Sequence, residues 1–175
     1  NGKKYAENIS QLALANVDYD MQNRHHISYN LMMIHANTQS VGDYNGKNSI
    51  FSDDYENLGF TRRQQTNDNM LIVNQLMTNW GLTKSLSLDA GASYNMVKGY
   101  EPDRRINNLT KAEDGYTLLR GNSQQRYFST LDEDDLNVKA GLVYRLKDDV
   151  EEISNIRLGY TGRFVAVSYT HLRAH

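Results

Sequence analysis

Cysteine is absent from this chain of 175 residues, and proline occurs only once, at Pro102. Without cysteine the chain can form neither disulfide bonds nor thiolate metal sites, which suits a protein that crosses an oxidising compartment. No apolar run reaches the length of about 18 residues that a membrane-spanning helix needs. The formal net charge is −2 and no basic stripe is present, so nothing favours nucleic acid as a partner.

The sequence contains several segments in which apolar and polar residues alternate. Between Ser85 and Met96 it has almost no exceptions, and a period of two predicts a β-strand with two unlike faces. The same pattern recurs over 136–146 and 156–164, and with more exceptions over 11–21, 26–36 and 70–80. The sequence therefore predicts an all-β protein, an antiparallel meander of about six long strands.

The second face of these strands is charged. Strands of about ten residues, apolar on one side and charged on the other, are typical of a transmembrane β-barrel, in which a Lys or Arg facing lipid at the midplane would cost about 2 to 4 kcal/mol. The charged residues are accordingly predicted to face a lumen that is wet or filled by a plug, with the strands forming a curved, open segment of the barrel. These residues are Asp89, Lys139, Arg145, Arg157 and Arg163.

Short and long connections alternate between the predicted strands. The short ones lie near 22–25, 82–84 and 147–153, and the long ones cover about 37–69 and 97–134. Outer-membrane barrels place short turns on the periplasmic side and long loops outside, whereas loops in compact soluble domains are mostly about 4 to 6 residues. We therefore expect both long segments to be extracellular loops, with Pro102 in the second.

Five segments of this chain, in their order and spacing, resemble segments of TonB-dependent receptors, the active transporters of Gram-negative outer membranes. They are GFTRRQQTNDN (59–69), VNQL (73–76), AGASYN (90–95), KGYEPDRRINNLT (98–110) and LDEDDL (131–136). The resemblance covers most of residues 10–165. It implies a full barrel of about 22 strands that encloses a plug domain.

The resemblance also implies a function and a set of partners. The protein would lie in the bacterial outer membrane and take up a nutrient such as an iron chelate, a cobalamin or a glycan. Its partners would be outer-membrane lipid, the TonB complex, the plug domain, the small-molecule or glycan ligand and a surface lipoprotein. Neither a cofactor nor an enzymatic activity is expected.

Two parts of the chain are distinguished. We expect residues 1–166 to be a partial outer-membrane β-barrel. Because the chain begins without Met, it is expected to be an internal piece, the alternative being a processed N-terminus. Residues 167–175 abandon the alternating pattern and resemble a translated sequencing adapter, so we expect them to be a non-native tail. His171 and His175 therefore carry no weight for function.

Charged residues in the two predicted loops are candidates for ligand binding, because paired guanidinium groups suit carboxylate or phosphate. Local ion pairs that fix the loops are the alternative. The candidates are Arg62, Arg63, Glu101, Asp103, Arg104 and Arg105.

Acidic residues and histidines are candidates for other chemistry. The run 132–135 could hold calcium or be a solvated loop end. His25, His26 and His35 could serve a metal or nucleophilic site, but adjacent residues of a strand point to opposite faces, which favours an ordinary turn. No serine lies in a nucleophile elbow, so the sequence predicts no catalytic residue and no metal site.

Two rival functions share the predicted strands. A passive porin or structural barrel would lack the plug and the segment that contacts TonB. A soluble β-sheet carbohydrate-binding module would be monomeric in water, whereas an open barrel segment would aggregate through its unpaired edges and uncovered apolar face.

Overall fold

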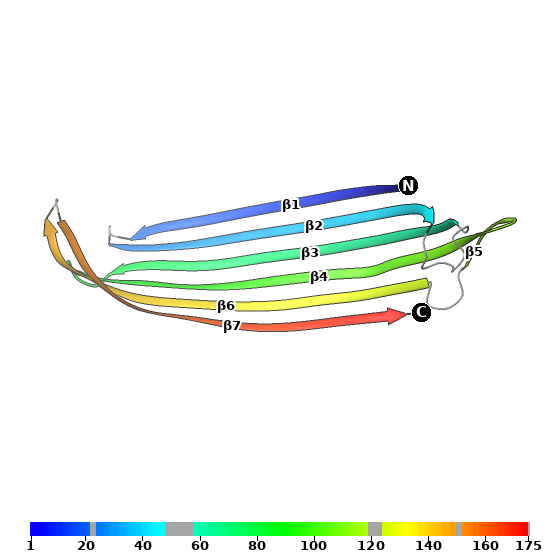
Figure 1. Ribbon diagram of the computed structural model, residues 1–175. Helices are drawn as coiled ribbons and strands as arrows, with labels where there is room; N and C mark the ends of the chain where they lie inside the picture. Colours follow the sequence, from blue (N-terminus) through cyan, green and yellow to red (C-terminus); the bar gives the residue numbers. More distant parts are fainter. Residues whose placement is uncertain (22–23, 48–57, 119–123, 150–151, 175) are drawn as a thin grey trace.

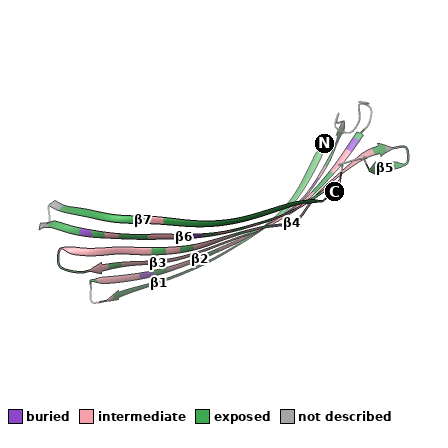
Figure 2. Ribbon diagram, turned by 90° about the horizontal axis from the view of Figure 1, so that it is seen from below, coloured by how far each residue is buried: buried purple, intermediate pink, exposed green. Residues whose placement is uncertain are grey.

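A single antiparallel sheet makes up the protein in the computed structural model, which describes residues 1–21, 24–47, 58–118, 124–149 and 152–174 (Figure 1). Its order is β1-β2-β3-β4-β6-β7, and the short β5 pairs with β4. The strands are β1 (Gly2–Met21), β2 (His25–Lys47), β3 (Leu58–Gly81), β4 (Leu86–Ala112), β5 (Gly115–Leu118), β6 (Gln124–Asp149) and β7 (Glu152–Ala174). The predicted all-β meander is confirmed, and the sheet is curved and open, with β1 and β7 as its edges (Figure 2).

The strands are far longer than the alternation alone indicates. Apart from β5 they contain 20 to 27 residues, about twice the 9 to 11 residues that cross a bilayer. The prediction of long loops over 37–69 and 97–134 is wrong for most of these residues, because β2 runs to Lys47, β3 starts at Leu58, β4 runs to Ala112 and β6 starts at Gln124. Strand pairing continues there although the hydropathy pattern has stopped.

Pro102 lies within β4 and not in a loop. The register shifts there against both neighbours: Glu101 pairs with Ser129 and Arg104 with Tyr127, so Pro102 and Asp103 oppose a single residue of β6. This is a β-bulge, which leaves one residue of the ladder unpaired. A proline fits because it has no backbone N–H to donate.

The register places the apolar faces of all six long strands on the same side of the sheet. Tyr94 pairs with Leu136, and Leu136 pairs with Phe164. We call this side the outer face, the opposite side the inner face, and the apolar rows of the outer face the belt. The belt comprises Ala13, Ala15, Val17 and Tyr19 of β1, Ile27, Tyr29, Leu31 and Met33 of β2, Ile72, Leu76 and Trp80 of β3, Leu86, Leu88, Ala90, Ala92, Tyr94 and Met96 of β4, Leu136, Val138, Ala140, Leu142 and Tyr144 of β6, and Ile156, Leu158, Tyr160 and Phe164 of β7.

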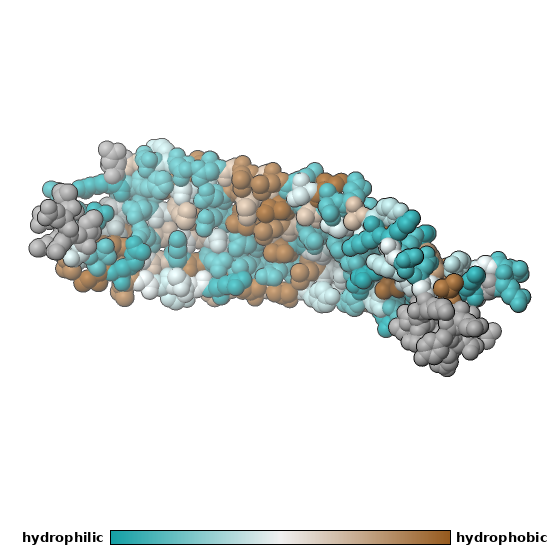
Figure 3. Space-filling view, turned by 45° about the horizontal axis from the view of Figure 1, so that its top comes forward, coloured by the Kyte–Doolittle hydropathy of each residue, from teal (hydrophilic) through white to brown (hydrophobic). Residues whose placement is uncertain are grey.

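Few side chains are buried, because no second layer covers either face. Val143 is the one buried hydrophobic side chain among the described residues, whereas Leu158 of the belt is 74% exposed. Hydrophobic side chains gather midway along the strands, with hydrophilic side chains towards both ends, on the face that Figure 3 displays. The described part of the chain contains no helix long and apolar enough to cross a membrane.

The segment beyond Val167 continues strand β7 as far as Ala174. Its residues pair with the first part of β6, from Glu133 opposite Val167 to Arg126 opposite Ala174. His175 lies outside the described residues. The loss of alternation in this segment is therefore not accompanied by a loss of strand pairing.

Candidate functional site

Charged side chains follow the inner face of β4, β6 and β7. The five residues predicted to face a lumen, Asp89, Lys139, Arg145, Arg157 and Arg163, all occupy strand positions opposite the belt. Because residues paired across neighbouring strands share a face, these side chains form one polar wall.

Two of the cations are paired with carboxylates on this wall. Arg157 reaches from β7 across β6 to Asp89 of β4, with 3.7 Å between Nη2 and Oδ2, and Asp89 also accepts a hydrogen bond from the Asn79 amide. Arg163 donates a hydrogen bond of 3.1 Å from Nε to the Asp135 carboxylate, and its Nη2 makes a second ion-pair contact with Asp135 at 3.0 Å. Asp135 is buried, so this second pair is the more strongly held.

Lys139 is different, because it forms no ion pair with the described carboxylates. Its stem lies across Gly91 of β4, where an added Cβ would come within 2.8 Å of the lysine Cε. The ammonium group ends 4.0 Å from the sulfur of Met77 on β3, a weak contact. The absence of a side chain at Gly91 therefore lets Lys139 extend across β4.

Two adjoining hollows of about 430 and 440 Å³ open on the inner face around Lys139. Met77, Lys139 and Thr161 belong to both. Arg163 lines the first, and Asp89 and Arg157 line the second. Arg145 lies outside them, near the turn before β4, in a separate depression that Arg24 also lines.

An apolar patch interrupts the inner face on the other half of the sheet. It forms two rows, in which Leu12 pairs with Ile34 and Leu14 with Met32, and the rows continue onto β3 and β4. Leu12 and Leu14 are 63% and 68% exposed. We call this the inner apolar patch; it comprises Leu12, Leu14, Met32, Ile34, Leu71, Val73 and Val97.

The predicted ligand-binding residues lie on the strand extensions beyond the belt, where the bulge divides them between the faces. In a regular strand Glu101 and Arg104, three positions apart, would point to opposite sides. The bulge puts both on the inner face, whereas Asp103 and Arg105 are on the outer face. The candidates in 101–105 therefore do not form one cluster.

Ion pairs tie neighbouring strands on the outer face of this extension. Arg62 of β3 donates two hydrogen bonds of 2.8 Å to Asp43 of β2. Asp103 accepts from Arg126 of β6 at 2.9 and 3.1 Å and from Arg105. The Arg126 guanidinium, and after it Arg105, holds the pKa of Asp103 below its usual value, since hydrogen bonds to a carboxylate favour its charged form.

On the inner face, Glu101 is the centre of a buried polar group. It is 9% exposed and accepts hydrogen bonds from the Gln65 amide at 2.8 Å and from Ser129 at 3.4 Å. Arg104 lies 3.8 Å from Glu101 and stacks over the Tyr127 ring, 4.4 Å from its centroid. Glu101 and Arg104 have partners on neighbouring strands. These partners could not be found from the sequence, because they depend on the register between strands.

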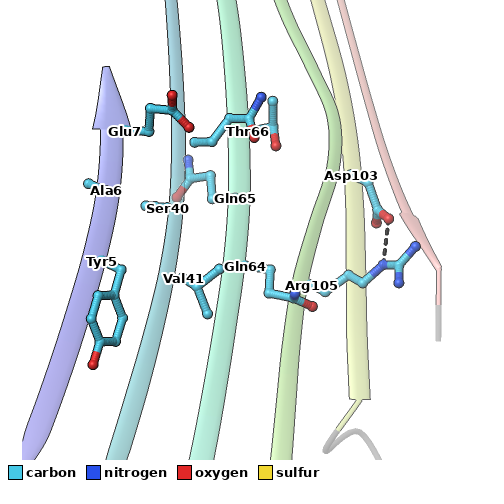
Figure 4. A pocket seen from close by; sticks show the side chains of 11 residues that line it. Tyr5, Ala6, Glu7, Ser40, Val41, Gln64, Gln65, Thr66, Asp103 and Arg105 are labelled. Atoms are coloured by element: carbon cyan, nitrogen blue, oxygen red, sulfur yellow. Dashed lines mark hydrogen bonds and ion pairs between the residues drawn. The ribbon is translucent and has the colours of Figure 1, made fainter. Parts of the chain in front are cut away.

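A shallow groove of about 510 Å³ crosses the outer face of the extension, where Tyr5 and Glu7 of the edge strand face Gln64, Asp103 and Arg105 (Figure 4). Arg63 is not part of it, because it lies on the inner face, where its guanidinium donates to Gln65 at 3.0 Å. The groove is open, and the ion pair between two of its lining residues is that of Asp103 with Arg105, drawn in Figure 4; Asp103 is also bonded to Arg126 outside the lining.

Neither the acidic run nor the histidines gather into one site. Asp132 and Asp134 alternate in the strand with Glu133 and Asp135, so their carboxylates divide between the two faces. His26 contacts Asp20 at 2.8 Å and Asp18 at 3.5 Å on the inner face. His35 contacts Asp68 at 2.5 Å on the outer face just beyond the belt, and His25 packs against Trp80. Within the described ranges, no three His, Asp or Glu side chains are arranged to hold a metal.

Comparison with known proteins adds no relative: no family model matches the chain, and no curated protein matches it.

Proposed function

We propose that this chain is a segment of a bacterial outer-membrane β-barrel of the TonB-dependent receptor type, which takes up a nutrient from outside the cell. The single observation that carries the proposal is the belt. Six strands align their apolar side chains in register on one face, and charged side chains follow the opposite face. On β4 the belt runs from Leu86 to Met96, about 33 Å along the strand and about 25 Å in height at a tilt of about 40°.

Two polar side chains of β3 that lie between belt residues have hydrogen-bond partners, as a lipid environment requires. Asn74 accepts a hydrogen bond of 2.8 Å from the Tyr29 hydroxyl. Thr78 donates one of 2.9 Å to the backbone carbonyl of His26. Trp80 and His25, whose rings are tilted against each other, lie at the edge of the belt next to the turns, where amphipathic rings favour a membrane interface.

The inner apolar patch favours a plugged transporter over a passive porin. In a water-filled channel its seven side chains would stay hydrated, whereas burying a Val, Leu, Ile or Met side chain contributes about 1.5 to 3 kcal/mol. A plug that fills the lumen would cover the patch and meet the charged wall beside it. The TonB complex would then supply the energy that moves the plug.

The strand extensions supply the part of the site that meets the ligand outside the cell. Of the six candidate residues, Arg63, Glu101 and Arg104 lie on the inner face, which borders the transport path of a barrel. Arg62, Asp103 and Arg105 are on the outer face and hold strands together through ion pairs. In the proposal the first three contact an iron chelate, a cobalamin or a glycan, and the second three keep the extension rigid.

Fluorescence of a single tryptophan tests the membrane assignment. Trp80 is the only tryptophan, so Trp80→Phe gives a silent background in which Leu76→Trp and Met77→Trp place the probe on adjacent positions of opposite faces. In vesicles with brominated lipids, we expect strong quenching of the probe at position 76 and little at 77. Equal quenching of the two probes would refute the proposal. A soluble monomer that does not bind vesicles would also refute it, and would support a carbohydrate-binding module.

Sequencing the parental gene in both directions separates the active transporter from the porin. The proposal expects a plug domain and a segment that contacts TonB before the barrel, and further alternating strands after it. A gene that encodes barrel strands alone would identify a passive or structural barrel.

A further inference from the structure

A lysine without a carboxylate partner lies between two hollows of the inner face. The hollows around Lys139 are lined by three cationic side chains, Lys139, Arg157 and Arg163, and by one carboxylate, that of Asp89. His26, at the border of the second hollow, is already engaged by Asp18 and Asp20. The lining therefore carries an excess of positive charge.

The backbone forms the floor of the hollows beside Lys139. Gly141 of β6 and Gly159 of β7 pair with each other, and no side chain lies within 4 Å of a Cβ added at either, whereas the Lys139 stem covers Gly91 of β4. At Gly159 an added Cβ would come within 3.2 Å of the Ala140 carbonyl oxygen. A solute can therefore approach the sheet closely and reach both the ammonium group and the polar side chains around it.

We propose that Lys139 and the two hollows form a binding site for a small anionic solute that carries a carboxylate or phosphate group. The anion contacts the Lys139 ammonium group, and the Ser93 and Thr161 hydroxyls beside it in the lining offer further hydrogen bonds. Arg157 adds positive charge from the second hollow, since its contact with Asp89 is long and its side chain is 70% exposed. Arg163 contributes less, because the buried Asp135 engages it in a hydrogen bond and a second ion-pair contact.

The site does not depend on insertion into a membrane, because residues of β2, β3, β4, β6 and β7 of this chain form it. Its consequence for transport rests on the proposed function: a wall site for anions makes the transported solute, or a part of it, anionic. The anion site and the proposed function can therefore be refuted by different results. A chain that passes the fluorescence test but binds no anion would keep the proposed function and lose this site.

Lysine reactivity measured residue by residue tests the site on the folded full chain in detergent micelles. Acetylation requires the neutral amine, and an anion beside an ammonium group stabilises the charged form. Each unit by which a bound anion raises the pKa of a lysine slows the acetylation of that lysine about tenfold. We expect this slowing, read by peptide mass spectrometry, with inorganic phosphate or citrate relative to chloride at equal ionic strength. Lys84 and Lys98, which lie outside the two hollows, serve as internal controls and keep their rates.

Variants of two inner-face arginines sharpen the test. Arg157→Gln removes positive charge from the second hollow and should weaken the protection of Lys139, whereas Arg145→Gln removes an equal charge outside both hollows and should leave it unchanged. Equal slowing at Lys84, Lys98 and Lys139, or none at Lys139, would overturn the site. If a glutamate-rich peptide protects Lys139 from acetylation but phosphate and citrate do not, the anion that binds the site belongs to a protein segment. That result would overturn the proposal of a small solute.

Discussion

An arginine placed in the middle of the belt should destabilise the membrane-inserted sheet far more than one placed on the next residue. Ala92 of β4 lies in the row that contains Leu76 and Val138, with belt residues of the same strand on both sides. Ser93 points to the inner face, between Gln75 and Asn137. The variants Ala92→Arg and Ser93→Arg therefore introduce the same side chain into the same strand, the first on the outer face and the second on the inner face.

The size of the effect follows from the depth of Ala92. Met96, the last belt residue of β4, is four residues away, which is about 13 Å along the strand and about 10 Å in height at a tilt of about 40°. An arginine at position 92 can reach only part of this distance, so most of the midplane penalty remains. We expect Ala92→Arg to lose about 2 to 4 kcal/mol of unfolding free energy, and Ser93→Arg to lose much less because its neighbours are polar.

Urea titration of the chain folded in lipid vesicles measures the difference, with Trp80 fluorescence as the signal. A gap of about 2 to 4 kcal/mol corresponds to a change of roughly 30-fold to 1,000-fold in the folding equilibrium. Equal destabilisation by the two arginines would show that the faces are not separated into lipid and lumen. A larger loss for Ser93→Arg would reverse the assignment of the faces.

Three further predictions concern the strand extension. Glu101→Ala should cost about 1 to 3 kcal/mol in urea unfolding, because the Gln65 amide loses its acceptor at a buried position; Glu101→Gln, which keeps an acceptor, should cost less, and an equal cost would contradict this account. Asp103 has a lowered pKa, so its ion pairs stabilise the fold fully above its unfolded pKa of about 4, and this stabilisation is lost as pH falls through the lower folded value. The difference in unfolding free energy between wild type and Asp103→Asn should therefore narrow below about pH 4. A difference that widens there would refute the direction of this pH dependence. Deletion of Pro102 should leave a regular ladder with Glu101 and Arg104 still on the inner face, whereas deletion of Ile106 should invert the faces of the residues after it; equal losses in urea titrations of the two deletions would contradict the position of the bulge.

The alternating pattern predicted the strands well where one face is apolar, and it failed beyond the belt for a physical reason. In β4 the alternation ends at Met96, and beyond Val97 the few apolar residues, such as Ile106 and Leu109, are scattered among polar ones, yet strand pairing continues to Ala112. The hydropathy of a side chain reflects its surroundings, whereas strand pairing is held by backbone hydrogen bonds, which do not depend on hydropathy. Polar extensions of this kind therefore look like loops in the sequence.

The sequence by itself determined which residues share a face within one strand, because successive side chains of a strand point to opposite sides. It thereby placed Asp89, Lys139 and Arg157 opposite the apolar residues. Only the tertiary structure decided which residues are neighbours, because register is a relation between strands. Register gave Arg157 a partner in Asp89, left Lys139 beside Gly91 without one, and separated Glu101 from Asp103 at the bulge.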